Sequence, residues 1–167
     1  MSGKAVQDCY PGEFAHCYGC GRLNEHGLKI KSYWEGEESV CRYQPQPYQT
    51  GGFPGFVYGG FIASLIDCHS SGTASVADWR ERGSSPNDEP PSHFVTASLR
   101  VDFIKPTPIC KTLELRSRTT EIKGRKIIVS TELSADNEIC ARGEAVMVRI
   151  PEDSHQSRQQ GIHRRRP

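Results

Sequence analysis

The sequence predicts an α+β domain in which one antiparallel sheet curls around a single long helix. Three observations predict it: an alternating hairpin pattern comes first, one long proline-free stretch follows, and four strand-like segments complete the chain. With 167 residues, the chain is long enough for one domain with a hydrophobic core and too short for two. We therefore expect a single domain.

The first elements are a hairpin and a long helix. Residues 27–34 alternate between apolar and polar side chains, and after a turn at Gly36 residues 39–43 return as the second strand. Prolines and glycines recur through residues 45–55, which indicates an irregular connection. The stretch 58–81 contains no proline, and its middle is rich in small side chains. We expect it to form a helix that a sheet grips closely.

The second half of the chain has the pattern of an antiparallel meander. Lys123 and Gly124 are typical of a tight hairpin turn between two of its strands. The predicted strands are 94–104, 112–122, 125–133 and 139–150.

Around this pattern the chain divides into three parts. Residues 1–26 show little periodicity, so we expect an N-terminal extension or lid without a core of its own. The domain itself is expected to span 27–151. Residues 152–167 are polar and end in three arginines and a proline, which predicts a disordered basic tail.

Composition and charge exclude several classes of partner. Lys and Arg number 21 against 20 Asp and Glu, so a net charge of +1 gives no overall attraction to nucleic acid. No apolar run approaches the roughly 20 residues of a membrane span, and the N-terminus lacks the apolar core of a signal peptide. We expect a cytoplasmic protein that binds neither nucleic acid nor a membrane.

Seven cysteines are an odd number in a chain without an export signal, so we expect reduced thiols. Cys17 and Cys20 have the spacing of two zinc ligands, and His16 or His26 offers a third. A second cysteine pair is absent. We therefore expect no metal, and we expect Cys68 to be a small buried side chain.

A glycine pair and a lone carboxylate mark the predicted helix. Gly59 and Gly60 stand at its start, where backbone N–H groups lack intrahelical partners and are good donors to a carbonyl that gains negative charge. Asp67 lies inside an otherwise apolar stretch and offers a base or a nucleophile. The alternative is that the glycines only permit close packing and that Asp67 meets solvent.

Five segments of the chain resemble one known family. They are 17–28, 54–67, 96–103, 105–108 and 123–126, and they are similar to the hotdog-fold acyl-CoA thioesterases of the PaaI-like and thioesterase-superfamily-member type. The resemblance implies a hotdog fold, in which the sheet wraps around one central helix. It also implies hydrolysis of acyl-CoA or acyl-carrier-protein thioesters without a cofactor, by a homodimer or a dimer of dimers.

The same resemblance implies roles for individual residues. Asp67 corresponds to the catalytic carboxylate, Gly59 to the residue whose N–H polarises the thioester carbonyl, and Thr96 to a hydroxyl that holds the attacking water. In relatives the carboxylate and the glycine N–H come from different subunits. Tyr58 stands where most relatives have histidine. The resemblance also implies that Gly60 contacts the substrate. Thr96 also suits a strand simply as a β-favouring residue.

Basic and aromatic side chains are candidates for substrate binding. Lys105, Arg125 and Lys126 are candidates to meet the phosphates of coenzyme A, although charged hairpin tips are usually just solvated. Aromatic residues that either line an acyl tunnel or belong to the core are Phe53, Phe56, Phe61 and Trp79.

Two other function classes compete with a hydrolase. A non-catalytic acyl-CoA-binding module is favoured by Tyr58 and by the loss of a glutamine or asparagine that relatives place where Gly51 and Gly52 stand, with Gln49 slightly upstream. A lyase or dehydratase of the same fold relies on a catalytic histidine. His69 is two residues beyond Asp67 and points to another side of the helix, so it is a poor partner for the carboxylate.

Overall fold

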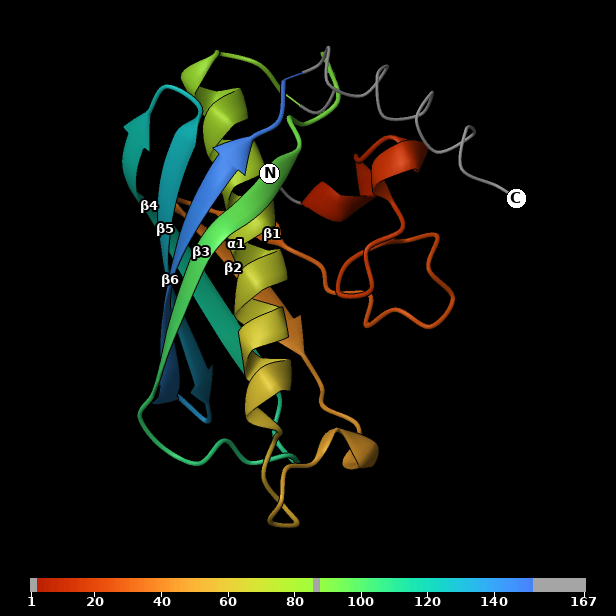
Figure 1. Ribbon diagram of the computed structural model, residues 1–167, viewed down its shortest axis with the longest axis vertical. Coiled ribbons are helices and arrows are strands. Elements are labelled where there is room, and N and C mark those ends of the chain that lie inside the picture. The colour runs from red at the N-terminus through yellow and green to blue at the C-terminus, as the bar shows by residue number, and fades with distance from the viewer. Residues whose placement is uncertain (1–2, 86–87, 152–167) are drawn as a thin grey trace, which may run out of the picture.

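The computed structural model describes residues 3–85 and 88–151, and it confirms the predicted α+β architecture: one long helix packs against a six-stranded antiparallel sheet (Figure 1). The sheet order is β1-β2-β4-β5-β6-β3. The predicted tail, 152–167, lies outside the described residues. The helix is α1, Gly59–Glu81, and the strands are β1 Tyr33–Glu35, β2 Glu38–Tyr43, β3 Phe94–Phe103, β4 Leu113–Lys123, β5 Lys126–Ala135 and β6 Glu138–Arg149; short 3-10 turns are Val6–Asp8, Gly12–Phe14 and Pro47–Gln49.

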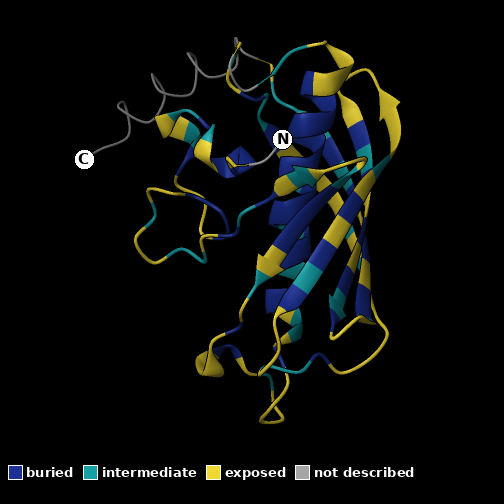
Figure 2. Ribbon diagram, turned by 180° about the vertical axis from the view of Figure 1, so that it is seen from behind, coloured by how far each residue is buried: buried dark blue, intermediate teal, exposed yellow. Residues whose placement is uncertain are grey.

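The core lies between α1 and the sheet. Figure 2 shows α1 buried along most of its length, and Leu65 and Ile66 are fully buried in it. A Cβ at Gly143 of β6 would lie 2.4 Å from Ile66 Cγ2, so only glycine lets the sheet approach the helix here. No helix in the described part of the chain has both the length and the apolar character needed to cross a membrane.

The first predicted strand was wrong over most of its length. The alternating stretch 27–34 forms a strand only at Tyr33–Glu35. Leu28 and Ile30 donate their backbone N–H groups to the carbonyl oxygens of residues 18–19, at 2.8 and 3.0 Å. Because these donors are engaged by the N-terminal segment, they do not extend the ladder with β2.

The N-terminal segment packs on the side of α1 that the sheet leaves uncovered (Figure 1). Val6 and Tyr10 are buried in a small apolar cluster with Val76 and Trp79 of the helix. The Tyr10 hydroxyl lies 3.0 Å from Ser75 Oγ, which satisfies a buried polar group. The segment is thereby attached to the C-terminal half of α1.

Strand β3 forms one edge of the sheet. It pairs with β6 along one side, with a bulge between Thr96 and Ser98, and its other side has no partner among the described residues. Val95 is exposed, and 58% of Phe103 is exposed. A long edge strand with apolar side chains is a ready template for pairing with another chain.

Candidate active site

The predicted carboxylate has a hydroxyl partner on the neighbouring strand. Asp67 is half-buried on α1, and Thr96 Oγ1 on β3 donates a hydrogen bond to Asp67 Oδ1. Burial raises the pKa of Asp67, the Thr96 bond opposes this, and the charge of nearby Cys17 adds to the rise. The carboxylate is therefore a stronger base than an exposed aspartate.

The start of α1 has backbone donors for which the described residues supply no hydrogen-bond partner. Tyr58 is the N-cap residue in an extended conformation, and its side chain makes no capping hydrogen bond. Phe61 and Ile62 donate their N–H groups to the Tyr58 carbonyl, at 3.0 and 3.2 Å. Gly59 and Gly60 precede them as the first two helical residues, so their N–H groups have no intrahelical acceptor. Such donors suit an oxyanion.

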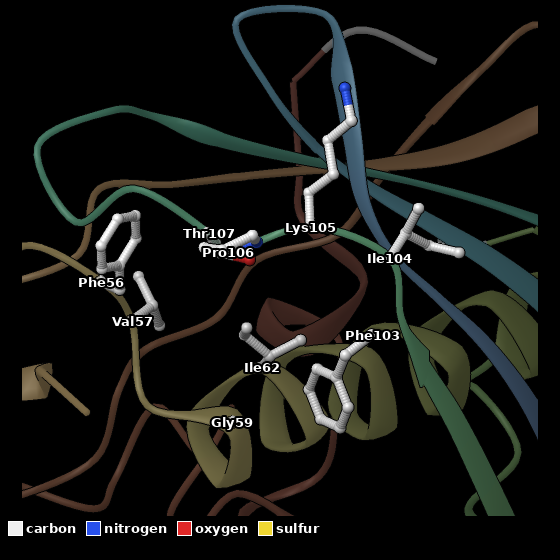
Figure 3. Close-up of a pocket in the computed structure, with 9 residues that line it drawn as sticks. All are labelled: Phe56, Val57, Gly59, Ile62, Phe103, Ile104, Lys105, Pro106 and Thr107. Carbon is white, nitrogen blue, oxygen red and sulfur yellow. The ribbon is translucent and has the colours of Figure 1, made fainter. Parts of the chain in front are cut away.

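A cavity of about 310 Å³ adjoins this helix start (Figure 3). It is mainly apolar, and the ammonium group of Lys105 points away from the other lining residues. A mainly apolar pocket beside backbone donors can hold an acyl chain with its carbonyl at the glycine pair. The lining residues are Phe56, Val57, Gly59, Ile62, Phe103, Ile104, Lys105, Pro106 and Thr107.

Within one chain, the carboxylate and the glycine N–H are too far apart to act on the same carbonyl. Gly59 and Asp67 are eight residues apart on a continuous helix, which corresponds to roughly 12 Å along its axis. Both groups must lie about 3 Å from the reacting atoms. One chain therefore carries two halves of a site rather than one complete site.

The candidate phosphate-binding residues lie near opposite ends of strand β3. Lys105 lies two residues beyond the end of β3, and its Nζ pairs with Glu138 Oε2 at 3.2 Å. Arg125 and Lys126 form the β4–β5 hairpin, where the Arg125 carbonyl accepts a hydrogen bond from Arg149, the residue paired with the first residue of β3. The structure does not bring these basic residues together within one chain.

A profile of the thioesterase superfamily matches residues 54–141, which include the helix start, Asp67 and Thr96. The chain belongs to the thioesterase superfamily. The crystal structure of a thioesterase superfamily protein from Shewanella loihica PV-4 is 42% identical, with a TM-score of 0.64 over 83% of this chain and 97% of that chain. The predicted hotdog fold is thereby confirmed.

Other relatives agree at lower similarity. The Escherichia coli PaaI protein of the phenylacetic acid degradation operon shares the fold, with a TM-score of 0.60 at 15% identity over 74% of this chain and 81% of that chain. Acyl-coenzyme A thioesterase THEM4 of Xenopus laevis is 32% identical over 111 residues, which are 66% of this chain and 44% of that protein. The chain thus spans less than half the length of that relative.

Two features near the helix start differ from the pattern expected of this superfamily: Tyr58 at the N-cap, and the loop before it, where a glutamine or asparagine is missing. Tyr58 is 59% exposed, and its ring lies beside Gly60, where an added Cβ would meet it at 2.5 Å. Gln49 does not replace the missing amide, because its Nε2 bonds to the Tyr43 hydroxyl at 3.1 Å and its Oε1 accepts from the Gln46 N–H at 2.7 Å. Both polar atoms of the Gln49 side chain are therefore used in hydrogen bonds within this part of the fold, so they do not bind a substrate or water.

His69 is a core residue and does not contact the carboxylate site. It is fully buried, its Nδ1 lies 2.8 Å from Ser32 Oγ, and its Nε2 lies 3.1 Å from the Ser39 carbonyl oxygen. Burial lowers the pKa of His69 to about 4. A neutral imidazole with both nitrogens occupied does not serve as a catalytic base, which removes the main candidate for lyase chemistry.

The four aromatic candidates for the acyl tunnel lie in different environments. Phe56 lines the cavity, and Phe61 is buried in the main core. Phe53 is exposed, and Trp79 packs under the N-terminal segment. Phe103, which the sequence argument did not single out, lines the cavity and lies 3.4 Å from the Cβ position of Gly59. One of the four named aromatics therefore contacts the candidate acyl site.

Sequence reasoning also missed a group of thiols beside Asp67. The sulfur atoms of Cys17, Cys20 and Cys68 lie within 4.8 Å of one another. Cys68 follows Asp67 directly on α1, whereas the other two come from the N-terminal segment. The only signal in the sequence was the Cys-x-x-Cys spacing, because nothing local predicts that this loop folds onto the helix.

Proposed function

We propose that this chain hydrolyses acyl-coenzyme A thioesters to the free acid and coenzyme A, in active sites that two copies of the chain share. One observation carries the proposal. In a member of the thioesterase superfamily, a hydroxyl-bonded carboxylate and a free helix-start N–H occupy positions roughly 12 Å apart on the same helix. A second copy brings them together.

The edge strand supplies the geometry for this pairing. Thr96 of β3 contacts Asp67, and Phe103 of β3 contacts the Gly59 end of the helix, so β3 runs antiparallel to α1. If two β3 strands pair antiparallel about a two-fold axis near residues 99–100, the Asp67 end of one copy lies opposite the Gly59 end of the other. Each dimer then has two complete sites.

The chemistry follows from these two groups. Thr96 holds Asp67 Oδ1, and Oδ2 takes a proton from a water molecule whose oxygen bonds to the thioester carbonyl carbon. The carbonyl oxygen becomes an oxyanion, and the N–H of Gly59 from the second copy stabilises it. The intermediate collapses, the C–S bond breaks, and the thiolate takes the proton from Asp67. Direct attack by Asp67, followed by hydrolysis of the anhydride, would use the same two groups.

Substrate binding is assigned to the cavity and the basic residues around it. The acyl group occupies the apolar cavity beside Gly59. The antiparallel pairing also brings Lys105 of one copy to the same end of the dimer as Arg125 and Lys126 of the other, where they can meet the phosphates of coenzyme A. A thioester carried on an acyl carrier protein presents the same reacting group and is the second substrate class.

The direct test is release of free thiol from a panel of short, medium, long-chain and aryl acyl-CoAs. The proposal predicts turnover of at least one class, and the best substrate identifies the acyl preference. If no substrate releases thiol while acyl-CoA raises the melting temperature, the protein is a binding module and the hydrolase proposal fails. Two features favour this alternative: Tyr58 is exposed, and the Gln49 side chain is hydrogen-bonded to Tyr43 and does not replace the missing amide.

Thr96 provides a graded prediction. Thr96→Val is expected to lower kcat about tenfold, because a hydrogen bond to a charged group contributes roughly 1.5–3 kcal/mol and this one is partly solvated. Thr96→Ser keeps the hydroxyl and is expected to retain activity within a few-fold. The measurement is kcat and KM for the best acyl-CoA. Equal activity of the Val and Ser variants would show that Thr96 serves only the strand.

A further inference from the structure

Three cysteines from distant parts of the chain meet beside the candidate active site. Cys17 and Cys20 lie on a loop of the N-terminal segment, and Cys68 lies on α1. The three sulfur atoms lie within 4.8 Å of one another, with Cys17 Sγ and Cys68 Sγ 3.8 Å apart. Cys20 and Cys68 are buried, and Cys17 reaches the surface.

The loop that carries Cys17 and Cys20 packs closely against α1. A Cβ at Gly19 would lie 2.2 Å from Cys68 Sγ, so the loop reaches the helix sulfur only because this residue is glycine. A Cβ at Gly21 would lie 2.4 Å from the Cys17 nitrogen, so glycine is required at this turn as well. The Gly21 N–H donates to the Cys17 carbonyl at 2.8 Å and closes the turn.

A lysine holds the other side of this loop. Lys29 Nζ donates to the carbonyl oxygens of Gly21 and Arg22 at 3.2 and 3.1 Å, and also to that of Asn24. These bonds fix the backbone that follows Cys20. The sulfur positions are thus set by the fold before any ligand arrives, as in a site built for a ligand.

We propose that Cys17, Cys20 and Cys68 bind a thiophilic divalent cation, with zinc as the expected ion. Tetrahedral zinc with Zn–S bonds of about 2.3 Å places its sulfur ligands about 3.8 Å apart. The Cys17–Cys68 separation equals this value, and the third sulfur lies within 4.8 Å. The loop also has the Cys-x-x-Cys-Gly form, which presents two sulfurs on one side of a tight turn.

The number and spacing of the sulfurs favour a metal over a disulfide. A disulfide requires an S–S distance of about 2.05 Å and joins two sulfurs, so it would leave the third thiol unused. A cation uses all three at nearly their present positions. The fourth position of the tetrahedron is left for water or another small ligand.

The cation would attach the N-terminal segment to α1 at the residue after Asp67. This attachment differs from the one that the apolar cluster around Tyr10 provides, because it lies further toward the start of the helix. Metal binding to the folded chain is expected to raise its melting temperature. This inference does not rest on the proposed hydrolysis.

The test measures metal content in the full-length protein purified without chelator. Mass spectrometric analysis of elements is expected to find about one zinc per chain in wild type and in Cys110→Ser, which removes an exposed cysteine outside the cluster. Cys17→Ser changes the ligand nearest the surface and should leave the core intact, which circular dichroism verifies. This variant is expected to lose most of the zinc.

A second measurement keeps the proposal testable if the purified protein has lost its metal. Cobalt(II) added to the reduced protein is expected to give thiolate-to-cobalt charge-transfer absorption and a higher melting temperature in wild type and Cys110→Ser but not in Cys17→Ser. Absence of both effects in wild type would overturn the proposal. So would an intact mass two hydrogens lower, with peptide mapping to a disulfide between two of the three cysteines.

Discussion

Asp67→Asn is expected to lower kcat/KM for the best acyl-CoA by at least ~100-fold. Asparagine has nearly the same shape, and its amide oxygen still accepts the hydrogen bond from Thr96, but its nitrogen takes no proton from water. The variant should therefore fold and assemble as wild type does. The measurement is thiol release at several substrate concentrations, with the assembly state checked by light scattering.

Asp78 on the same helix provides the matched control. Its buried carboxylate pairs with Arg82 and Arg149, at 3.0 and 3.1 Å, far along α1 from the cavity. Asp78→Asn is expected to lower the melting temperature while leaving kcat of the folded enzyme within a few-fold of wild type. If Asp67→Asn behaves like Asp78→Asn, the Asp67 carboxylate is structural and the proposed mechanism is wrong.

Gly59→Pro is expected to lower kcat by about 100- to 1,000-fold, the usual effect of removing an oxyanion donor. Proline has no N–H, and the first helical position accepts it well because its fixed φ suits a helix start. Tyr58, the preceding residue, already has the extended conformation that precedes proline, with φ −61° and ψ 132°. The substitution therefore removes the donor with little cost to the helix.

Gly59→Ala separates the lost donor from the added bulk. Its Cβ would meet Phe103 at 3.4–3.5 Å, which is close to ordinary contact, and its N–H stays in place. We expect Gly59→Ala to keep kcat within a few-fold of wild type, although KM for long acyl chains can rise as the cavity narrows. Similar losses in the Pro and Ala variants would mean that the effect is steric, and the oxyanion role of Gly59 would be lost.

The helix and the later strands could be predicted because their patterns are local. A proline-free stretch with small side chains gave α1, and alternation with a Lys123-Gly124 turn gave the β4–β5 hairpin. The prediction of the first strand failed because an alternating pattern does not say which segment of backbone the strand will pair with. Leu28 and Ile30 bond to the N-terminal segment, which carries no periodic signal of its own.

Parts of the site could be predicted from the sequence only where a residue type in its local pattern indicates a chemical role. Asp67 in an apolar helix and a glycine pair at its start were visible, and the resemblance indicated Thr96 as a hydroxyl that holds the attacking water. The hydrogen bond from Thr96 to Asp67 was seen only in the structure. The distance between Gly59 and Asp67 could be stated only once the structure showed that one continuous helix carries both residues. The contact of Cys17 with Cys68, 51 residues away, required the tertiary fold, since no local rule relates them.

The shared active site is tested most directly by a heterodimer of two inactive variants. Asp67→Asn and Gly59→Pro chains, co-expressed with different tags and purified through both, give a dimer in which one site combines an intact Asp67 with an intact Gly59. The predicted activity is about half that of the wild-type dimer, while each parental homodimer stays inactive. A heterodimer as inactive as its parents would contradict a site shared between two chains.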